Sequence, residues 1–282
     1  MSIFEAIILG IIQGLTEFLP ISSTGHLTLA GKFMHLINED NPEKWTSFIA
    51  VIQLGTLIAI LLYFRREIII IVQSFIKNNI ASRVKFKNQD ESSKLGWYII
   101  AGTIPVVIIG ILFKDIIEGS LTKNLYVISI SLIVLAVILA IAEKTANHRK
   151  EMKDINFRDA FIVGIAQAFA LIPGSSRSGT TITGGLFAGL TRETAARFSF
   201  LLSIPAIFAS GVLQLYEALE YIDGSMALTI GIATLFSGLS GYLAIDFLLK
   251  YLKKNSTFIF IYYRIILGLF ILLLLFFNAI KP

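Results

Sequence analysis

Two apolar segments of this chain are each interrupted by a short polar loop rich in serine and glycine. The loops fall within residues 13–26 and 167–181. They share residues at matching positions: Gln13 with Gln167, Pro20 with Pro173 and Ser23 with Ser176. Hydrocarbon offers backbone groups no hydrogen-bond partners, so irregular backbone at membrane depth occurs only where protein buries it or it lines a wet cavity. We therefore predict that the loops arose by duplication and form the functional site.

The composition places the chain among polytopic membrane proteins. Of its 282 residues 55% are apolar and 15% charged, and the mean hydropathy is +0.78; a spanning helix needs about 20 apolar residues. Stretches of this length predict six transmembrane helices, at 46–64, 97–113, 124–143, 196–216, 227–249 and 258–279. The interrupted segments, 2–36 and 159–190, divide into halves too short to span, so we predict two re-entrant helical hairpins in an all-α fold.

Basic residues gather in three of the connecting loops. Cations are frequent in 65–94, 144–158 and 250–254, but scarce in 37–45, 114–123 and 217–225. The positive-inside rule predicts that the three basic loops are cytoplasmic. Topology thus accounts for the net charge of +5, and we expect no nucleic-acid partner. The chain has no cysteine, which excludes disulfides and thiol chemistry.

The chain reads as two halves, approximately 1–145 and 155–282, each a hairpin followed by three spanning helices. Three is an odd number, so duplication inverts the second half. We expect an inverted-topology repeat within a single membrane domain, 1–282, with both termini outside and the hairpins entering from opposite sides.

The polar residues of both interrupted segments predict an anion site. Gln13 and Glu17 share one helix face near its carboxyl end, where a carboxylate is disfavoured unless a metal ion, Arg177 or a proton offsets it. Serine and glycine then begin a new helix in each segment and would supply substrate-binding groups: Ser22, Thr24 and Gly25 in the first, and Ser176, Ser178, Gly179 and Thr180 in the second.

Two helix amino termini and an arginine fork suit a phosphate or pyrophosphate. Ser23 is a candidate nucleophile, and Glu17 or His26 could take its proton. His26 is alternatively the acid for the leaving group, or the nucleophile itself. Near the ends of the last two helices we expect Asp246 and Arg264 to be a structural pair or snorkelling groups.

These residues resemble the undecaprenyl pyrophosphate phosphatase family of bacteria, the integral-membrane type linked to bacitracin resistance. The resemblance rests on Gln13 to Glu17, Pro20 to His26 and the run Pro173-Gly-Ser-Ser-Arg-Ser-Gly179, and extends to 51–55 and 198–202. It implies that undecaprenyl pyrophosphate is hydrolysed to the monophosphate and phosphate, which recycles the lipid carrier of peptidoglycan synthesis. It also implies a bacterial cytoplasmic membrane location, with the site facing the outer side.

By the same resemblance, Glu17 is the acid of an (E/Q)xxxE signature, Ser23 the nucleophile, His26 the assisting group and Arg177 the phosphate clamp. The family also implies a divalent cation, Mg or Ca, for which Gln13 and Glu17 are the candidate ligands. Gln13 stands where glutamate is frequent, which weakens the metal assignment. We allow for a homodimer, and the alternative function is a flippase or transporter of phosphorylated lipid that uses the same anion site.

Overall fold

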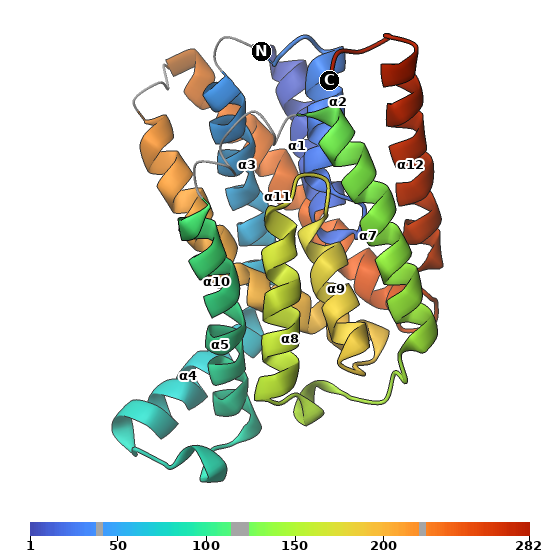
Figure 1. The fold of residues 1–282 in the computed structure, drawn as a ribbon. Coiled ribbons are helices and arrows are strands. Elements are labelled where there is room, and N and C mark those ends of the chain that lie inside the picture. Colours follow the sequence, from blue (N-terminus) through green and yellow to red (C-terminus); the bar gives the residue numbers. More distant parts are fainter. Residues whose placement is uncertain (38–41, 114–123, 220–223) are drawn as a thin grey trace.

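The computed structural model describes residues 1–37, 42–113, 124–219 and 224–282, and every regular element among them is helical (Figure 1). The helices are α1 Ile3–Phe18, α2 Ser23–Phe33, α3 Pro42–Tyr63, α4 Arg65–Ile76, α5 Glu91–Leu112, α7 Leu125–Thr145, α8 Phe157–Ala168, α9 Arg177–Phe187, α10 Arg192–Ala218, α11 Gly224–Leu252 and α12 Phe258–Phe276. Most of the cation-poor loops, at 38–41, 114–123 and 220–223, lie outside the described residues.

Within the described ranges, five helices are long and apolar enough to cross a membrane: α5, α7, α10, α11 and α12. Each overlaps one of the predicted spans over most of its length. The remaining prediction, 46–64, falls on α3, which qualifies only together with α4, to which it is joined at a bend of 77°. The protein is therefore an all-α multi-pass membrane protein with five candidate spans, or six if the bent pair is one.

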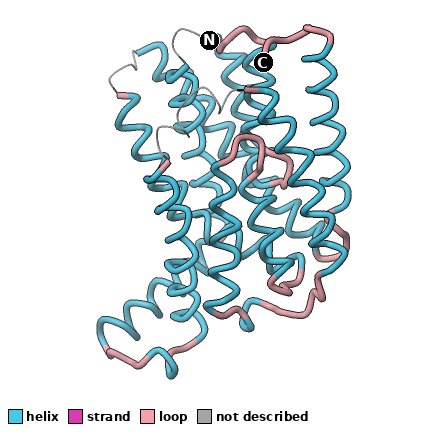
Figure 2. The backbone as a smooth tube through the Cα atoms, viewed as in Figure 1, coloured by secondary structure: helices cyan, strands magenta, loops and turns pink. Residues whose placement is uncertain are grey.

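Both interrupted segments form two short helices joined by a break. Helices α1 and α2 are separated at 19–22, and α8 and α9 at 169–176, where a single 3-10 turn follows α8. The α8–α9 break lies partway along the bundle rather than at its end (Figure 2). The open end of α1–α2 lies beside the chain termini, where Lys32 Nζ contacts the carbonyl of Lys281 at 2.9 Å, whereas α8 and α9 open toward the opposite end (Figure 1).

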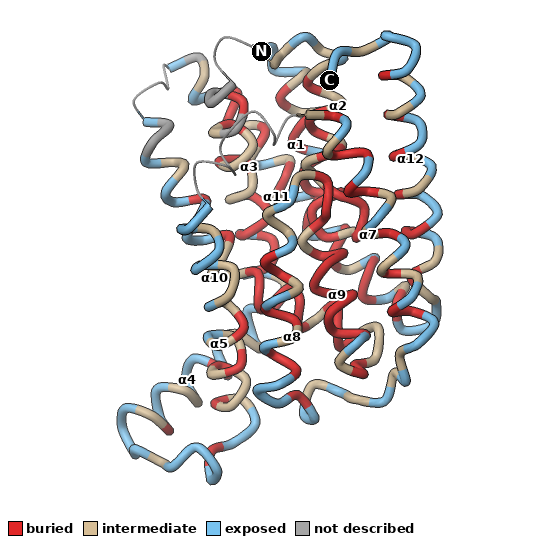
Figure 3. Tube along the Cα trace, in the orientation of Figure 1, coloured by how far each residue is buried: buried red, intermediate tan, exposed pale blue. Residues whose placement is uncertain are grey.

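Close backbone packing places α1 within the bundle. Helix α1 packs along α11 and contacts α2, α3 and α9. Gly14 makes this possible, because a Cβ there would lie 2.3 Å from the Ser237 carbonyl oxygen of α11. Small residues at such crossings let membrane helices approach closely. Buried residues are concentrated along the inner helices, whereas outward faces carry exposed apolar side chains suited to lipid (Figure 3).

The segment 65–94, predicted to be a basic loop, contains several helical elements. It contains α4, a π-helical turn at Lys77–Ala81 and a 3-10 turn at Phe86–Asn88. Helix α4 forms because its apolar residues, Ile71 among them, pack toward α5. Asp90 caps α5 by accepting the Ser93 N–H at 2.9 Å, and also accepts the Ser74 hydroxyl, which ties the two helices together.

Candidate active site

Ser22 shapes the backbone of the first break. Its φ of 76° lies in the left-handed region, and its Oγ accepts the N–H of Gly25 at 3.2 Å. Ser22 is thus the N-cap of α2, which makes Ser23 the first helical residue, Thr24 the second and the buried Gly25 the third. The side chain satisfies one of the amide groups that a helix start leaves without an internal partner.

The second break repeats this cap. Ser176 has a φ of 67°, and its Oγ accepts the N–H of Gly179 at 3.2 Å, which makes Arg177 the first residue of α9. The equivalent of Ser176 is therefore Ser22, and the predicted pairing of Ser176 with Ser23 was wrong by one residue. The prolines mislead the alignment because the second break holds its proline one position earlier relative to the cap. The corrected register places Ser23 and Arg177 at equivalent positions.

Glu17, at the carboxyl end of α1, connects both helix starts. Its Oε2 accepts the Ser23 hydroxyl at 2.6 Å and the Gln13 amide at 3.0 Å, and its Oε1 forms an ion pair with Arg177 Nη2. Only 6% of Glu17 is exposed, and Gln13 is fully buried. The first residues of α2 and α9 therefore lie within reach of one buried carboxylate, although they are more than 150 positions apart in sequence.

The other predicted binding residues of α9 lie around the same helix start. The Ser178 hydroxyl donates to the Leu19 carbonyl at 3.0 Å, which joins the two breaks, and shares a 3.2 Å hydrogen bond with Ser176. The Thr180 hydroxyl donates to the Arg177 carbonyl at 3.0 Å. Ser176, Ser178 and Thr180 thus bond within the protein and order the loop.

His26 has its own partners. Nδ1 lies 2.7 Å from the Ser22 carbonyl, and Nε2 lies 2.6 Å from the Tyr263 hydroxyl of α12, whose ring stacks on the imidazole. A carbonyl only accepts, so Nδ1 carries the hydrogen, and in a neutral ring Nε2 then accepts from the phenol. In this arrangement Ser23 donates to Glu17 rather than to His26.

Arg264 lies beside the start of α9, and the predicted pair of Arg264 with Asp246 is wrong. It does not pair with Asp246, which bonds to Lys250 and Tyr63. Instead Arg264 is fully buried, and its Nη2 donates to the Ser175 carbonyl at 2.8 Å. Its Nη1 lies 2.6 Å from where a Cβ on Gly179 would be. An arginine within the last apolar helix was the signal available in the sequence, because buried intramembrane charges are costly.

Several buried polar atoms of this region have no hydrogen-bond partner among the described residues: Gln13 Oε1, Ser175 Oγ, Arg264 Nε and Arg264 Nη1. Buried polar groups are normally paired, and each exception calls for an explanation such as an absent ligand. No group of three or more acidic or histidine side chains positioned to hold a metal occurs in the described part of the chain. A divalent cation would take Gln13 Oε1 and Glu17 from the protein and complete its shell with phosphate oxygens and water, as Mg²⁺ commonly does.

Comparison with known proteins matches residues 6–270 to the family of bacitracin resistance protein BacA. An undecaprenyl-diphosphatase of Syntrophobacter fumaroxidans is 55% identical over 268 residues, which cover 95% of each chain. Proteins of the same name from Chlorobium phaeobacteroides and Chloroherpeton thalassium are 52% and 51% identical, with 96% or more of each chain covered.

Proposed function

This chain belongs to the bacitracin resistance protein BacA family, and from this premise we propose that it hydrolyses undecaprenyl diphosphate to undecaprenyl phosphate and phosphate. Such a reaction recycles the lipid carrier for peptidoglycan precursors and would account for bacitracin resistance. The observation that carries the mechanism is the placement of Ser23 and Arg177 on opposite oxygens of the same carboxylate, Glu17.

The diphosphate binds where α2 and α9 begin. Helix starts offer free amide groups and partial positive charge, which suits phosphate oxygens. Arg177 engages Glu17 through one nitrogen. A guanidinium has five N–H donors in a planar fork, so the remaining donors serve the phosphates while the ion pair holds the side chain in place.

Arg264 supplies a second buried positive charge beside the start of α9. Among the residues that the structure describes, Arg264 Nη1 and Nε have no acceptor, so both can donate to a bound ligand. A diphosphate carries more negative charge than one arginine offsets, particularly when that arginine also contacts Glu17. We assign Arg264 to binding of the diphosphate, with the Ser175 carbonyl holding its orientation.

Ser23 attacks the terminal phosphorus, and its proton passes to Glu17, the acceptor already 2.6 Å away. The bond from that phosphorus to the bridging oxygen breaks, and the lipid monophosphate leaves. Water then attacks the phosphoserine, the serine oxygen departs and recovers a proton, and phosphate is released. His26 orients the Ser22 cap and the α2 helix start through its bonds to Ser22 and Tyr263.

A divalent cation fits this proposal through Gln13 Oε1 and Glu17, together with substrate oxygens. When bound, it would neutralise phosphate charge. Glutamine at position 13 offers one neutral ligand atom, so we expect weaker metal binding than a second carboxylate would give.

The proposed topology is an inverted repeat of 1–145 and 155–282 within one domain, with α1–α2 and α8–α9 as re-entrant hairpins and the site open to the outer side of the membrane. The matching caps at Ser22 and Ser176, and the opposed open ends of the hairpins, support this arrangement. Accessibility of cysteines introduced at Lys87 and near Met1 to an impermeant reagent tests it, since only the second should react in intact cells. The proposal also allows a homodimer, which light scattering in detergent would detect as a doubled protein mass.

Phosphate release from undecaprenyl diphosphate by the purified protein tests the function. We expect steady release, with a strong loss in Arg177→Ala and in Ser23→Ala. Arg83→Ala, in the distant basic segment, is the matched control and should keep the wild-type rate. Lipid transfer between leaflets that persists in Ser23→Ala without any hydrolysis by the wild type would favour a flippase instead.

A further inference from the structure

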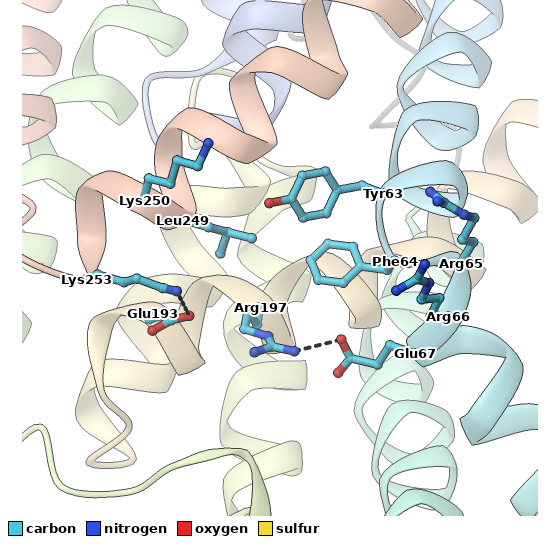
Figure 4. A pocket seen from close by; sticks show the side chains of 10 residues that line it. All are labelled: Tyr63, Phe64, Arg65, Arg66, Glu67, Glu193, Arg197, Leu249, Lys250 and Lys253. Atoms are coloured by element: carbon cyan, nitrogen blue, oxygen red, sulfur yellow. Dashed lines mark hydrogen bonds and ion pairs between the residues drawn. The ribbon is translucent and has the colours of Figure 1, made fainter.

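A basic pocket (Figure 4) lies where α3 meets α4, at the end of the bundle away from the chain termini (Figure 1). It has a volume of about 530 Å³ and lies between the α3–α4 corner, the start of α10 and the end of α11. Its charged lining comprises five cationic and two acidic side chains: Arg65, Arg66, Arg197, Lys250 and Lys253, with Glu67 and Glu193. None of the residues of the Glu17 site contributes to it.

The internal ion pairs leave this pocket positively charged. Arg197 bonds to Glu67 at 2.8 Å, and Lys253 to Glu193 at 3.4 Å (Figure 4). Lys250 pairs with Asp246 at 2.7 Å, outside the lining, so among the residues described the uncompensated cations are Arg65 and Arg66. Within the described residues Arg66 has no carboxylate partner. The Nε of Arg197 is buried and lacks a hydrogen-bond acceptor in the same part of the chain. A donor buried without a partner beside uncompensated cations favours an anionic ligand.

An apolar groove adjoins the basic pocket. It has a volume of about 720 Å³, and α3, α4, α5 and α10 line it almost wholly with aliphatic and aromatic side chains. The two linings share no residue but lie next to each other along two helices. Glu67 of the pocket precedes Ile68 of the groove on α4, and Arg197 precedes Leu201 by one turn on α10.

The groove faces outward. Ile100 of α5 is 46% exposed and Phe208 of α10 is 59% exposed, on helices long enough to span a bilayer. A ligand there is therefore in contact with the membrane along its length. The basic pocket thus lies at the ends of α3 and α11, and the apolar groove lies beside it along α4, α5 and α10.

We propose that the pocket and groove together bind one anionic glycerophospholipid of the surrounding membrane. Its phosphodiester lies among Arg66, Arg197 and Lys253, and an acyl chain occupies the groove. Charge complementarity selects an anionic head over a zwitterionic one, and an apolar groove directly beside the basic pocket selects a lipid over a free anion. Bound in this way, the lipid joins α4 to α10 beside the 77° bend between α3 and α4, and it stabilises the folded protein increasingly as the lipid concentration rises above its Kd.

Native mass spectrometry of the detergent-purified protein tests this site. Phosphatidylglycerol and phosphatidylcholine of the same chain length are added in equal amounts. We expect wild type to retain one phosphatidylglycerol, several-fold more than phosphatidylcholine. In the double variant Arg66→Gln, Lys253→Gln, the ratio of retained phosphatidylglycerol to phosphatidylcholine should fall at least about fivefold. This corresponds to the loss of roughly 1 kcal/mol of head-group interaction. Ile100→Trp, which narrows the groove, should lower retention without changing any charge.

The matched control is Lys85→Gln, Lys87→Gln, which removes the same charge from an exposed segment outside the pocket; its lipid retention should equal that of wild type. Phosphate release from a short-chain prenyl diphosphate should be unchanged in all three variants, which shows that they fold. Equal retention of both lipids by wild type would overturn the proposal. So would an equal loss in the control, tighter retention of undecaprenyl phosphate than of phosphatidylglycerol, or complete displacement of the lipid by inorganic phosphate.

Discussion

Ser23 donates its hydroxyl hydrogen to Glu17 Oε2 at 2.6 Å, whereas Arg177 pairs with the other carboxylate oxygen, Oε1. A single buried side chain thus positions the proposed nucleophile and the proposed phosphate clamp. The arrangement explains how a carboxylate is tolerated at the carboxyl end of α1, where the helix dipole disfavours it: Arg177 provides the compensating charge.

Replacement of the proposed base gives the first prediction. Glu17→Gln keeps the hydrogen bonds that an amide can make but removes the proton acceptor and the partner of Arg177. We expect kcat to fall by about 10²- to 10⁴-fold, the usual contribution of a positioned base. Steady-state phosphate release measures it, with Glu5→Gln on the exposed start of α1 as control. A rate within threefold of wild type would exclude Glu17 as the base.

The proposed role of Arg264 can be tested by removing its charge and by displacing its side chain. Arg264→Gln should raise KM by about 10- to 100-fold, corresponding to 1.5–3 kcal/mol for hydrogen bonds to a charged group, and Arg264→Lys should recover part of the loss. Gly179→Ala should give the same phenotype while leaving the arginine in the sequence, because the new Cβ would lie 2.6 Å from Arg264 Nη1 and displace it. A normal KM in Arg264→Gln would restrict the residue to a structural role.

Tyr263→Phe separates two roles for His26. The substitution keeps the stacked ring and removes the hydroxyl that bonds to Nε2. If His26 only positions α2, loss of this hydrogen bond should cost about 1 kcal/mol and lower kcat less than tenfold. His26→Ala should lower kcat further. If Tyr263→Phe abolishes turnover as fully as Glu17→Gln, proton transfer runs through the His26–Tyr263 pair.

Asp90, which caps α5 outside the spanning segments, predicts how the stability of the protein changes with pH. Hydrogen bonds from Ser74 and from the Ser93 amide hold the pKa of its carboxyl below the ordinary value. Its stabilising contribution is therefore complete at neutral pH and is lost as the pH falls through that lowered pKa. Asp90→Ala should cost about 1 kcal/mol at pH 7, as other N-cap losses do, and the difference in Tm from wild type should shrink in acid. Glu91→Ala, at the next residue, is the control, and a pH-independent difference would contradict the linkage.

The sequence predicted the helices and much of the site because both depend on local patterns. Apolar stretches fixed five spans, and the serine-glycine runs marked the two helix starts correctly. The equivalence of Ser23 with Arg177 was missed because aligning the prolines shifts the register by one residue, and only cap geometry resolves it. Arg264 was missed for another reason: apart from Arg264 itself, α12 is almost wholly apolar on every face, so no local pattern shows which neighbour it contacts. Its approach to Gly179 depends on tertiary packing. The bend between α3 and α4 depends on packing in the same way.

The most direct test of the account is to find the residue that carries the phosphate. Wild-type protein mixed with undecaprenyl diphosphate labelled at its terminal phosphate, quenched within milliseconds and digested for mass spectrometry, should yield label on Ser23. Ser23→Ala should yield no labelled peptide and no phosphate release. Label on His26, or rapid hydrolysis by Ser23→Ala, would contradict the mechanism built on the Ser23–Glu17 contact.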